Sequence, residues 1–151
     1  MIAADIMTRA VVTATPETDL ATVARLLLEH NISAMPVIDD RRRLVGIISE
    51  GDLLGRPSEK SFRGSWLRLF SSDAGTLEEL ATARHLKVAD VMTRRVVSVS
   101  DETPINVVAS LMHLHKLKRV PVLRDSELVG IISRIDVIGG LVGRATAGDL
   151  C

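Results

Sequence analysis

Two serine–aspartate pairs with identical spacing are the residues of this chain best suited to chemistry. Ser49 and Asp52 lie in LVGIISEGDLL, and Ser133 and Asp136 lie at the matching places in LVGIISRIDVI. Such a pair, placed before apolar residues, is typical of a capping box that satisfies free N–H groups of a first helical turn. The same geometry suits a nucleotide, because a helix N-terminus binds phosphate and a carboxylate accepts hydrogen bonds from ribose hydroxyls. The two roles are compatible, and both stay open at this point.

The sequence offers little to other kinds of chemistry. Cys151 is the only cysteine, so thiol catalysis and an internal disulfide are not expected. His113 and His115 are two residues apart, which on a helix turns them away from a shared ion. No glycine-rich phosphate loop or Cys–His pair is found in the sequence. We therefore expect neither a catalytic site nor a metal site, and we expect that the chain is not an enzyme.

Composition excludes several classes of partner. The chain has 151 residues, and its 19 Lys and Arg balance 19 Asp and Glu, so no overall charge attracts it to a nucleic-acid duplex or an anionic membrane. Aromatic residues make up only 2% of the sequence, which disfavours base-stacking surfaces. No apolar run approaches the ~20 residues of a membrane helix, and no signal peptide is expected. These features favour a cytoplasmic protein.

The chain repeats itself, and the repeat defines the architecture. DIMTRAVV at 5–12 matches DVMTRRVV at 90–97, MPV at 35–37 matches VPV at 120–122, and LVGIIS recurs without change. Each copy has only about 50 residues, which is too few to bury a secure core alone. The repeat therefore predicts two copies packed through their sheets as a pseudo-twofold pair.

Each copy shows the same order of expected elements. A β-prone run at 11–15 precedes a helix that begins near Leu20, with Thr18 as its expected cap. Two strands at 34–39 and 44–49 follow, and a second helix starts near Ser49 or, in the other copy, near Ser133. Asp5 and Asp90 are interpreted as caps of short segments. The predicted fold is mixed α/β (α+β), with two β-α-β-β-α repeats.

The expected domain boundaries follow the repeats. Repeat 1 spans 1–54, an insert spans 55–87, repeat 2 spans 88–140 and a C-terminal tail spans 141–151. The insert holds Trp66, beside an amphipathic stretch, and a helical pattern at 76–86. It either packs on a neighbouring molecule or folds over the chain's own surface, and the sequence does not separate these alternatives.

The tandem motifs resemble those of the cystathionine-β-synthase (CBS) domain pair, also called a Bateman module. The resemblance rests on DxMT, the central PV and GIISxxD in both copies, and it covers residues 5–54 and 90–138. It implies a regulatory module that binds an adenosyl compound between the repeats: AMP, ADP, ATP, S-adenosylmethionine or an NAD-type nucleotide. It also implies a homodimer and a regulated partner protein that is not identified. The insert resembles that of bacterial CBS-pair proteins that often continue into a BON domain, which is not expected to follow here.

Carried onto this sequence, the resemblance implies a main nucleotide site around Asp136, whose counterpart in the family holds the ribose. Residues before the central PV often reach the phosphates in the family, and here these are Lys118 and Arg119, joined by Arg134. Ile131 and Ser133 belong to the same wall of the cleft. The opposite wall, with its apolar members against adenine, is expected to contain Met7, Thr8, Val12, Ile32 and Ser33.

A second, weaker site is implied around Asp52. Its expected members are Ile47, Ser49 and Asp52, faced by Thr93, Val97, Leu117 and Lys118. Glu50 follows Ser49 where Arg134 follows Ser133, and a carboxylate there repels phosphate. We therefore expect the Asp136 site to be the main one. The alternative function is a ligand-free scaffold, in which the repeats and the insert serve only dimerisation.

Overall fold

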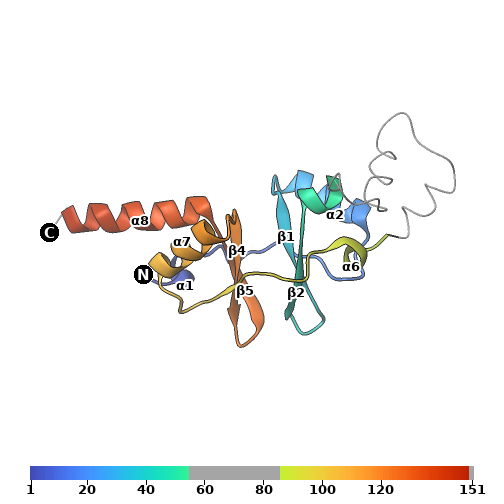
Figure 1. Cartoon of the computed structure of the whole chain (residues 1–151), viewed down its shortest axis with the longest axis horizontal. Coiled ribbons are helices and arrows are strands. Elements are labelled where there is room, and N and C mark those ends of the chain that lie inside the picture. The colour runs from blue at the N-terminus through green and yellow to red at the C-terminus, as the bar shows by residue number, and fades with distance from the viewer. Residues whose placement is uncertain (55–85, 150–151) are drawn as a thin grey trace. The chain divides into compact units, whose positions relative to one another are not determined.

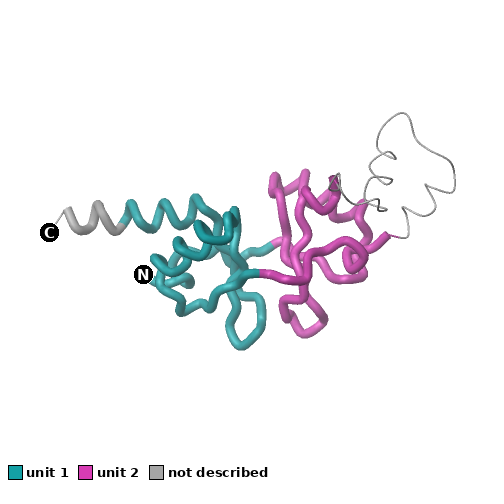
Figure 2. The backbone as a smooth tube through the Cα atoms, in the orientation of Figure 1, with its two compact units in different colours: residues 1–11, 97–151 teal, residues 12–96 magenta. Residues whose placement is uncertain are grey.

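The computed structural model describes residues 1–54 and 86–149, with side chains described as far as residue 143. The chain divides into two compact units (Figure 2): unit 1 consists of residues 1–11 and 97–151, and unit 2 consists of residues 12–96. The units do not coincide with the sequence repeats. The first residues of each repeat belong to the unit that contains the rest of the other repeat, so each unit is built from both copies.

In the described residues of unit 2, a two-stranded antiparallel sheet packs with helices α2, α3 and α6 (Figure 1). Its elements are α2 (Leu20–Glu29), β1 (Ala34–Ile38), β2 (Leu44–Ser49), α3 (Glu50–Leu54) and α6 (Val88–Val91). In the β1–β2 hairpin Met35 lies opposite Ile48, and both side chains are fully buried. Asp39 organises the turn, since its carboxylate accepts from the backbone N–H groups of Arg41 and Arg43, each at 2.9 Å.

Unit 1 repeats the order of helix, hairpin and helix (Figure 1). Its elements are α1 (Ala3–Ile6), β3 (Val99–Ser100), α7 (Ile105–Leu114), β4 (Arg119–Arg124), β5 (Glu127–Ser133) and α8 (Arg134–Asp149). Strand β4 is central, with β3 parallel to it on one side and β5 antiparallel on the other. The predicted β-α-β-β-α order is therefore seen in full in the second repeat.

The first strand and the first cap differ from the sequence prediction. In repeat 1 the expected strand at 11–15 is reduced to a single bridge between Ala14 and Val37. Thr18 does not cap α2; its hydroxyl accepts from the N–H of Thr15 at 3.0 Å and closes the preceding turn. Asp19 is the cap instead, accepting from the N–H of Thr22 at 2.8 Å. The Thr18 hydroxyl is engaged in the preceding turn and does not bond to the N–H of Thr22. The Asp19 carboxylate, one residue later, does.

Each unit has its own buried core, completed by a segment from the other repeat. In unit 1, Ala3 and Met7 pack with Ile105, Val120 and Ile132 of the second repeat. In unit 2, the equivalent residues Val88 and Met92 join the core of the first repeat. A single repeat therefore lacks part of its own core, which is consistent with the expectation that 50 residues bury too little apolar surface.

The predictions for the insert fall mainly outside the described residues. Trp66 and the helical pattern at 76–85 belong to that part, as does Cys151. Leu86, which follows it, is described, and its carbonyl accepts from the N–H of Leu20 at 3.3 Å. Among the helices in the described part of the chain, none combines the length and apolar character needed to cross a membrane.

Candidate functional site

The two DxMT segments lie directly on the GIIS strands of the opposite repeat. In unit 2 the backbone N–H and C=O groups of Thr93 and Ile47 exchange two hydrogen bonds of 2.9 Å. In unit 1 Thr8 and Ile131 do the same, at 2.9 and 3.0 Å. The motifs that recur in the sequence are therefore contact partners, and each contact joins one repeat to the other within one unit.

A glycine in each GIIS strand permits this close approach. A Cβ atom built on Gly46 would lie 2.7 Å from Met92 Sδ and 3.0 Å from the carbonyl oxygen of Thr93. On Gly130 it would lie 2.5 Å from Met7 Sδ and 3.0 Å from Met7 Cβ. At both positions the shortest distance, to the methionine sulfur, is too short for a Cβ atom unless the methionine shifts, so glycine gives the DxMT methionine the space to lie against the strand. Sequence reasoning did not assign this role, although the glycines recur in LVGIIS.

The predicted capping boxes are present at both helix starts. Asp52 Oδ2 accepts from the Ser49 N–H at 2.9 Å, and Asp136 Oδ2 accepts from the Ser133 N–H at 2.8 Å. In return the serine hydroxyls accept from the aspartate N–H groups, at 3.4 Å in α3 and 3.2 Å in α8. Asp5 and Asp90 cap their short helices in the same manner, as predicted, with bonds of 2.7 and 2.9 Å.

The two aspartates differ in what else they bind. Asp52 Oδ1 accepts from the Thr93 hydroxyl at 3.3 Å, the Ser49 hydroxyl also donates to Oδ2 at 3.2 Å, and Asp52 is only 8% exposed. Asp136 is half-buried, and within the described parts of the chain its Oδ1 has no hydrogen-bond partner and Thr8 does not reach it. The Asp136 carboxylate therefore retains an acceptor for a ligand, whereas that of Asp52 is internally satisfied.

Positive charge gathers beside Asp136 and negative charge beside Asp52. The N–H of Arg134 donates to the carbonyl of Lys118 at 3.2 Å, and Arg134 Nε donates to the carbonyl of Leu117 at 2.8 Å. The side chains of Arg134 and Lys118 are exposed. In unit 2 the corresponding bond runs from the N–H of Glu50 to the carbonyl of Ser33 at 2.8 Å. Anionic groups are thus attracted to the α8 start and repelled from the α3 start.

The units divide the predicted site residues as follows. For the main site, unit 1 contains Met7, Thr8, Lys118, Arg119, Ile131, Ser133, Arg134 and Asp136, whereas Val12, Ile32 and Ser33 belong to unit 2. For the second site, unit 2 contains Ile47, Ser49, Asp52 and Thr93, whereas Val97, Leu117 and Lys118 belong to unit 1. The participation of residues from the opposite unit stays a prediction for both sites.

His30 and His115 are helix-end residues, as interpreted from the sequence. His30 and His115 follow α2 and α7, and their N–H groups donate to the carbonyls of Leu26 and Leu111 at 3.1 and 3.0 Å. Across residues 1–54 and 86–149, no three His, Cys, Asp or Glu side chains are grouped closely enough to hold a metal ion.

Known proteins are similar to this chain over most of its length. An uncharacterized protein of Methanocaldococcus jannaschii, MJ1426, is 34% identical over 94% of this chain and 92% of its own length. The chloroplastic CBS domain-containing protein CBSX2 of Arabidopsis thaliana is 33% identical over 82% of this chain but only 55% of its own length.

Solved structures agree with the fold. The crystal structure of CBSX2 in complex with AMP has a TM-score of 0.74 at 27% identity and covers 95% of this chain and 98% of its own. The CBS domain of a membrane protein from Sphaerobacter thermophilus has a TM-score of 0.70 at 34% identity, over 92% and 86% of the two chains. The predicted α+β tandem fold is thereby confirmed.

The family model described as the CBS domain matches this chain twice, at residues 3–59 and 88–143. The chain belongs to the CBS domain family and carries two CBS domains in tandem.

Proposed function

We propose that this chain is a regulatory module that senses an adenosine nucleotide at the start of α8, with Asp136 as the ribose acceptor. The observation that carries the proposal is the half-buried Asp136 carboxylate, which has one oxygen in the capping box and the other available. The capping bond fixes the orientation of the carboxylate, and the available oxygen accepts from the ribose hydroxyls. A single side chain thus serves both the helix and the ligand.

The AMP found in the CBSX2 complex supports a nucleotide of this class. Here the exposed Lys118 and Arg134 supply the phosphate with charge-assisted hydrogen bonds at the α8 N-terminus. Thr8, held on β5 by its two backbone bonds, adds a hydroxyl on the same unit. The phosphate end of the ligand is therefore recognised mainly by charge, and the sugar by Asp136.

The Asp52 site is proposed as the weaker of the two. A ribose there must replace the 3.3 Å bond from Thr93, and its phosphate meets Glu50 instead of Arg134. Both effects oppose nucleotide binding. We expect one adenosine nucleotide per chain at moderate concentration.

Binding is proposed to change conformation or partner contacts, which requires that the nucleotide favour one arrangement over another. The family resemblance adds Val12, Ile32 and Ser33 to the ligand contacts, and their participation is part of the proposal. The process that is regulated is not specified by these residues.

A thermal-shift screen with AMP, ADP, ATP, S-adenosylmethionine and NADH tests the proposal. A ligand at 100 times its Kd adds roughly 2.7 kcal/mol to the free energy of unfolding. We expect a shift with at least one adenosine nucleotide, which Asp136→Asn reduces and Asp52→Asn preserves. An equal shift in wild type and Asp136→Asn would exclude the assigned site.

The ribose contact has its own test. The 2′-deoxy form of the best ligand lacks one donor to the Asp136 carboxylate, so we expect it to bind about 1–3 kcal/mol more weakly in calorimetry. In Asp136→Asn the two forms should bind almost equally. A full 2′-deoxy penalty in that variant would show that another group holds the ribose.

The alternative is an assembly scaffold without a ligand. It is favoured by exposed apolar side chains on α8, such as Ile135 (76% exposed) and Ile138 (56% exposed), because such surfaces mark interaction sites. The scaffold predicts no thermal shift with any of the nucleotides. The same screen therefore separates the two functions.

A further inference from the structure

The turn between β1 and β2 concentrates positive charge at one end of the hairpin. Arg41, Arg42 and Arg43 form the only run of three cationic residues in the sequence, and all three are exposed. Two carboxylates, Asp39 and Asp40, precede them. We refer to residues 39–43 as the arginine turn. An exposed cluster of this kind is either solvated or a contact site for anionic groups.

The second repeat shows that a hairpin at this place does not need arginines. The matching turn of unit 1, between β4 and β5, is one residue shorter and presents Asp125, Ser126 and Glu127, all of them exposed. It closes between equivalent strands, with Asp125 and Ser126 at φ angles of 51° and 69°. The arginines are therefore not required to form the hairpin, and the two turns carry opposite charge.

The backbone of the arginine turn is held in place by Asp39. Its Oδ1 accepts from the N–H groups of Arg41 and Arg43 at 2.9 Å, and its carbonyl accepts from the N–H of Arg42 at 3.1 Å. The hydrogen bond from the Arg43 backbone holds the pKa of the Asp39 carboxyl below its usual value of 3.8, so this group is charged at neutral pH. A turn that is already ordered loses less conformational freedom when a partner binds.

Two of the three guanidinium groups are available to a partner. Arg43 Nε lies 3.1 Å from Asp39 Oδ2, so the charge of Arg43 is paired within the turn. Across residues 1–54 and 86–149, the side chains of Arg41 and Arg42 form neither a hydrogen bond nor an ion pair. Each guanidinium offers five N–H donors in a planar fork.

The chemistry of the turn favours carboxylates over nucleic acid and lipid. The guanidinium fork fits a carboxylate with two parallel hydrogen bonds. The chain has no net charge and only 2% aromatic residues, which disfavours binding to the backbone and bases of a nucleic acid. Residues 39–43 include no apolar side chain and three cations, whereas lipid-binding basic segments have about 4–8. A protein segment rich in Asp and Glu is the class of partner that remains.

We propose that the arginine turn docks an acidic segment of another protein, with Arg41 and Arg42 each paired to a carboxylate. Exposed charge pairs are individually weak and are screened by salt, so the contact is reversible. The turn precedes β2, whereas Ser49 and Asp52 lie at and beyond its other end. Docking at the turn is therefore separate from the Ser–Asp motif and does not depend on nucleotide binding.

Fluorescence anisotropy of a labelled hexaglutamate peptide, titrated with the full chain at low ionic strength, tests the proposal. We expect saturable binding that added salt weakens. Arg41→Glu combined with Arg42→Glu should weaken it about tenfold, because two attractive pairs become repulsive. Arg41→Lys combined with Arg42→Lys keeps the charge but loses the fork, and should bind with intermediate affinity.

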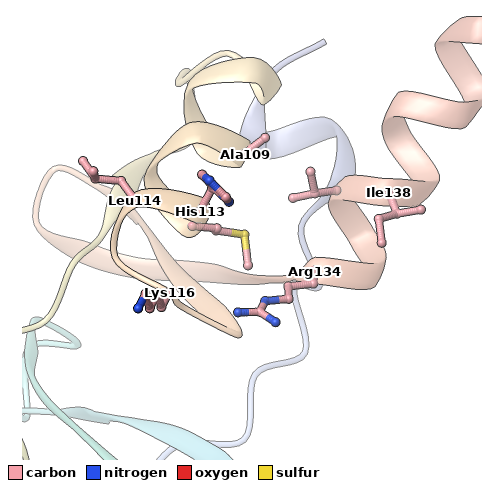
Figure 3. Close-up of a pocket in the computed structure, with 8 residues that line it drawn as sticks. Ala109, His113, Leu114, Lys116, Arg134 and Ile138 are labelled. Atoms are coloured by element: carbon pink, nitrogen blue, oxygen red, sulfur yellow. The ribbon is translucent and has the colours of Figure 1, made fainter.

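The matched control combines Arg95→Glu with Lys116→Glu. It changes the net charge by the same amount as the two glutamate substitutions in the turn, and both residues are exposed and lie outside the arginine turn. Lys116 and Arg134 line a groove between α7 and α8 (Figure 3), so the control also tests whether another cationic surface binds the peptide. We expect its affinity to stay within about twofold of wild type, since only screened, long-range attraction is lost.

Several results would overturn the proposal. These are a wild-type chain that does not bind the peptide, unchanged binding after the glutamate substitutions in the turn, and an equal loss of binding in the control. Tighter binding of a single-stranded oligonucleotide than of the peptide, lost in the turn variant, would assign the turn to nucleic acid instead. The turn variant should melt at the temperature of wild type, because its hydrogen bonds to Asp39 come from the backbone. Its nucleotide-induced thermal shift should also equal that of wild type, so the peptide and nucleotide measurements fail or succeed separately.

Discussion

At the scale of single residues, the repeated Ser–Asp spacing predicted local geometry well. Both capping boxes form, because a serine and an aspartate three apart need only one helical turn to meet. The bond from Thr93 to Asp52 joins residues 41 positions apart. Spacing within one helical turn does not predict a contact between residues so far apart in the sequence. The difference in hydrogen bonding between Asp52 and Asp136 could therefore not be predicted from the motif. It depends on how one repeat contributes to the unit of the other.

The glycine of the GIIS strand gives a first prediction. Gly46→Ala places a Cβ against the Thr93 carbonyl and Met92, and we expect this overpacking to cost about 1–3 kcal/mol of unfolding free energy. Gly139→Ala is the control, because nothing lies within 4 Å of its Cβ and alanine favours a helix by about 1 kcal/mol. Urea denaturation of the two variants measures both effects. Equal stability of Gly46→Ala and wild type would show that the close contact of Met92 and Thr93 with the strand does not require glycine at position 46.

The Asp19 cap gives a prediction about pH. Its hydrogen bonds from Thr22 hold the pKa of the Asp19 carboxyl below its usual value of 3.8. Because the folded pKa is the lower one, the stabilisation is present above pH 3.8 and is lost as the pH falls through the folded pKa. Asp19→Asn caps without titrating. The difference in unfolding free energy between wild type and this variant should therefore shrink in acid, and a difference that is constant with pH would contradict the charged cap.

At the scale of elements, hydrophobic periodicity predicted the helices and hairpins of both repeats but not which repeat completes which core. The first segment of each repeat has its partners in the other repeat, within the same unit: the N–H of Ala3 in α1 donates to the carbonyl of Thr103 at 2.8 Å, and the N–H of Val88 in α6 donates to the carbonyl of Thr18 at 2.9 Å. The motifs of both copies are nearly identical, so either repeat could have accepted either segment on sequence grounds. Only the tertiary structure shows that the two repeats exchange their first segments, so that each segment packs on the other repeat instead of on its own.

The exchange predicts crossed effects of two matched variants. Met7 is 9% exposed and packs in the unit 1 core, while Met92 is 8% exposed and packs in the unit 2 core. Each methionine replaced by alanine should cost about 2–5 kcal/mol. Hydrogen exchange should quicken first at Ile131 in Met7→Ala and at Ile47 in Met92→Ala, because these amides bond to the displaced segments. Loss of protection confined to the mutated residue's own repeat would contradict the exchanged arrangement.

At the scale of the whole molecule, the repeat predicted two similar units, and the resemblance of its motifs to those of a known family predicted a tandem CBS fold, which the family match confirms. Equivalent positions then carry the functional difference, since Arg134 follows Ser133 where Glu50 follows Ser49. These two residues give the two helix starts opposite charge. The assignment of the main nucleotide site depends on this asymmetry.

The most direct measurement is the mapping of backbone amide chemical shifts during an AMP titration of the full chain. We expect the largest, saturable changes at Thr8, at Lys118 and from Ser133 to Asp136, with much smaller changes from Ser49 to Asp52. Absence of any change up to millimolar AMP, or changes centred on Asp52 and sparing Asp136, would contradict the assignment of the α8 start as the nucleotide sensor.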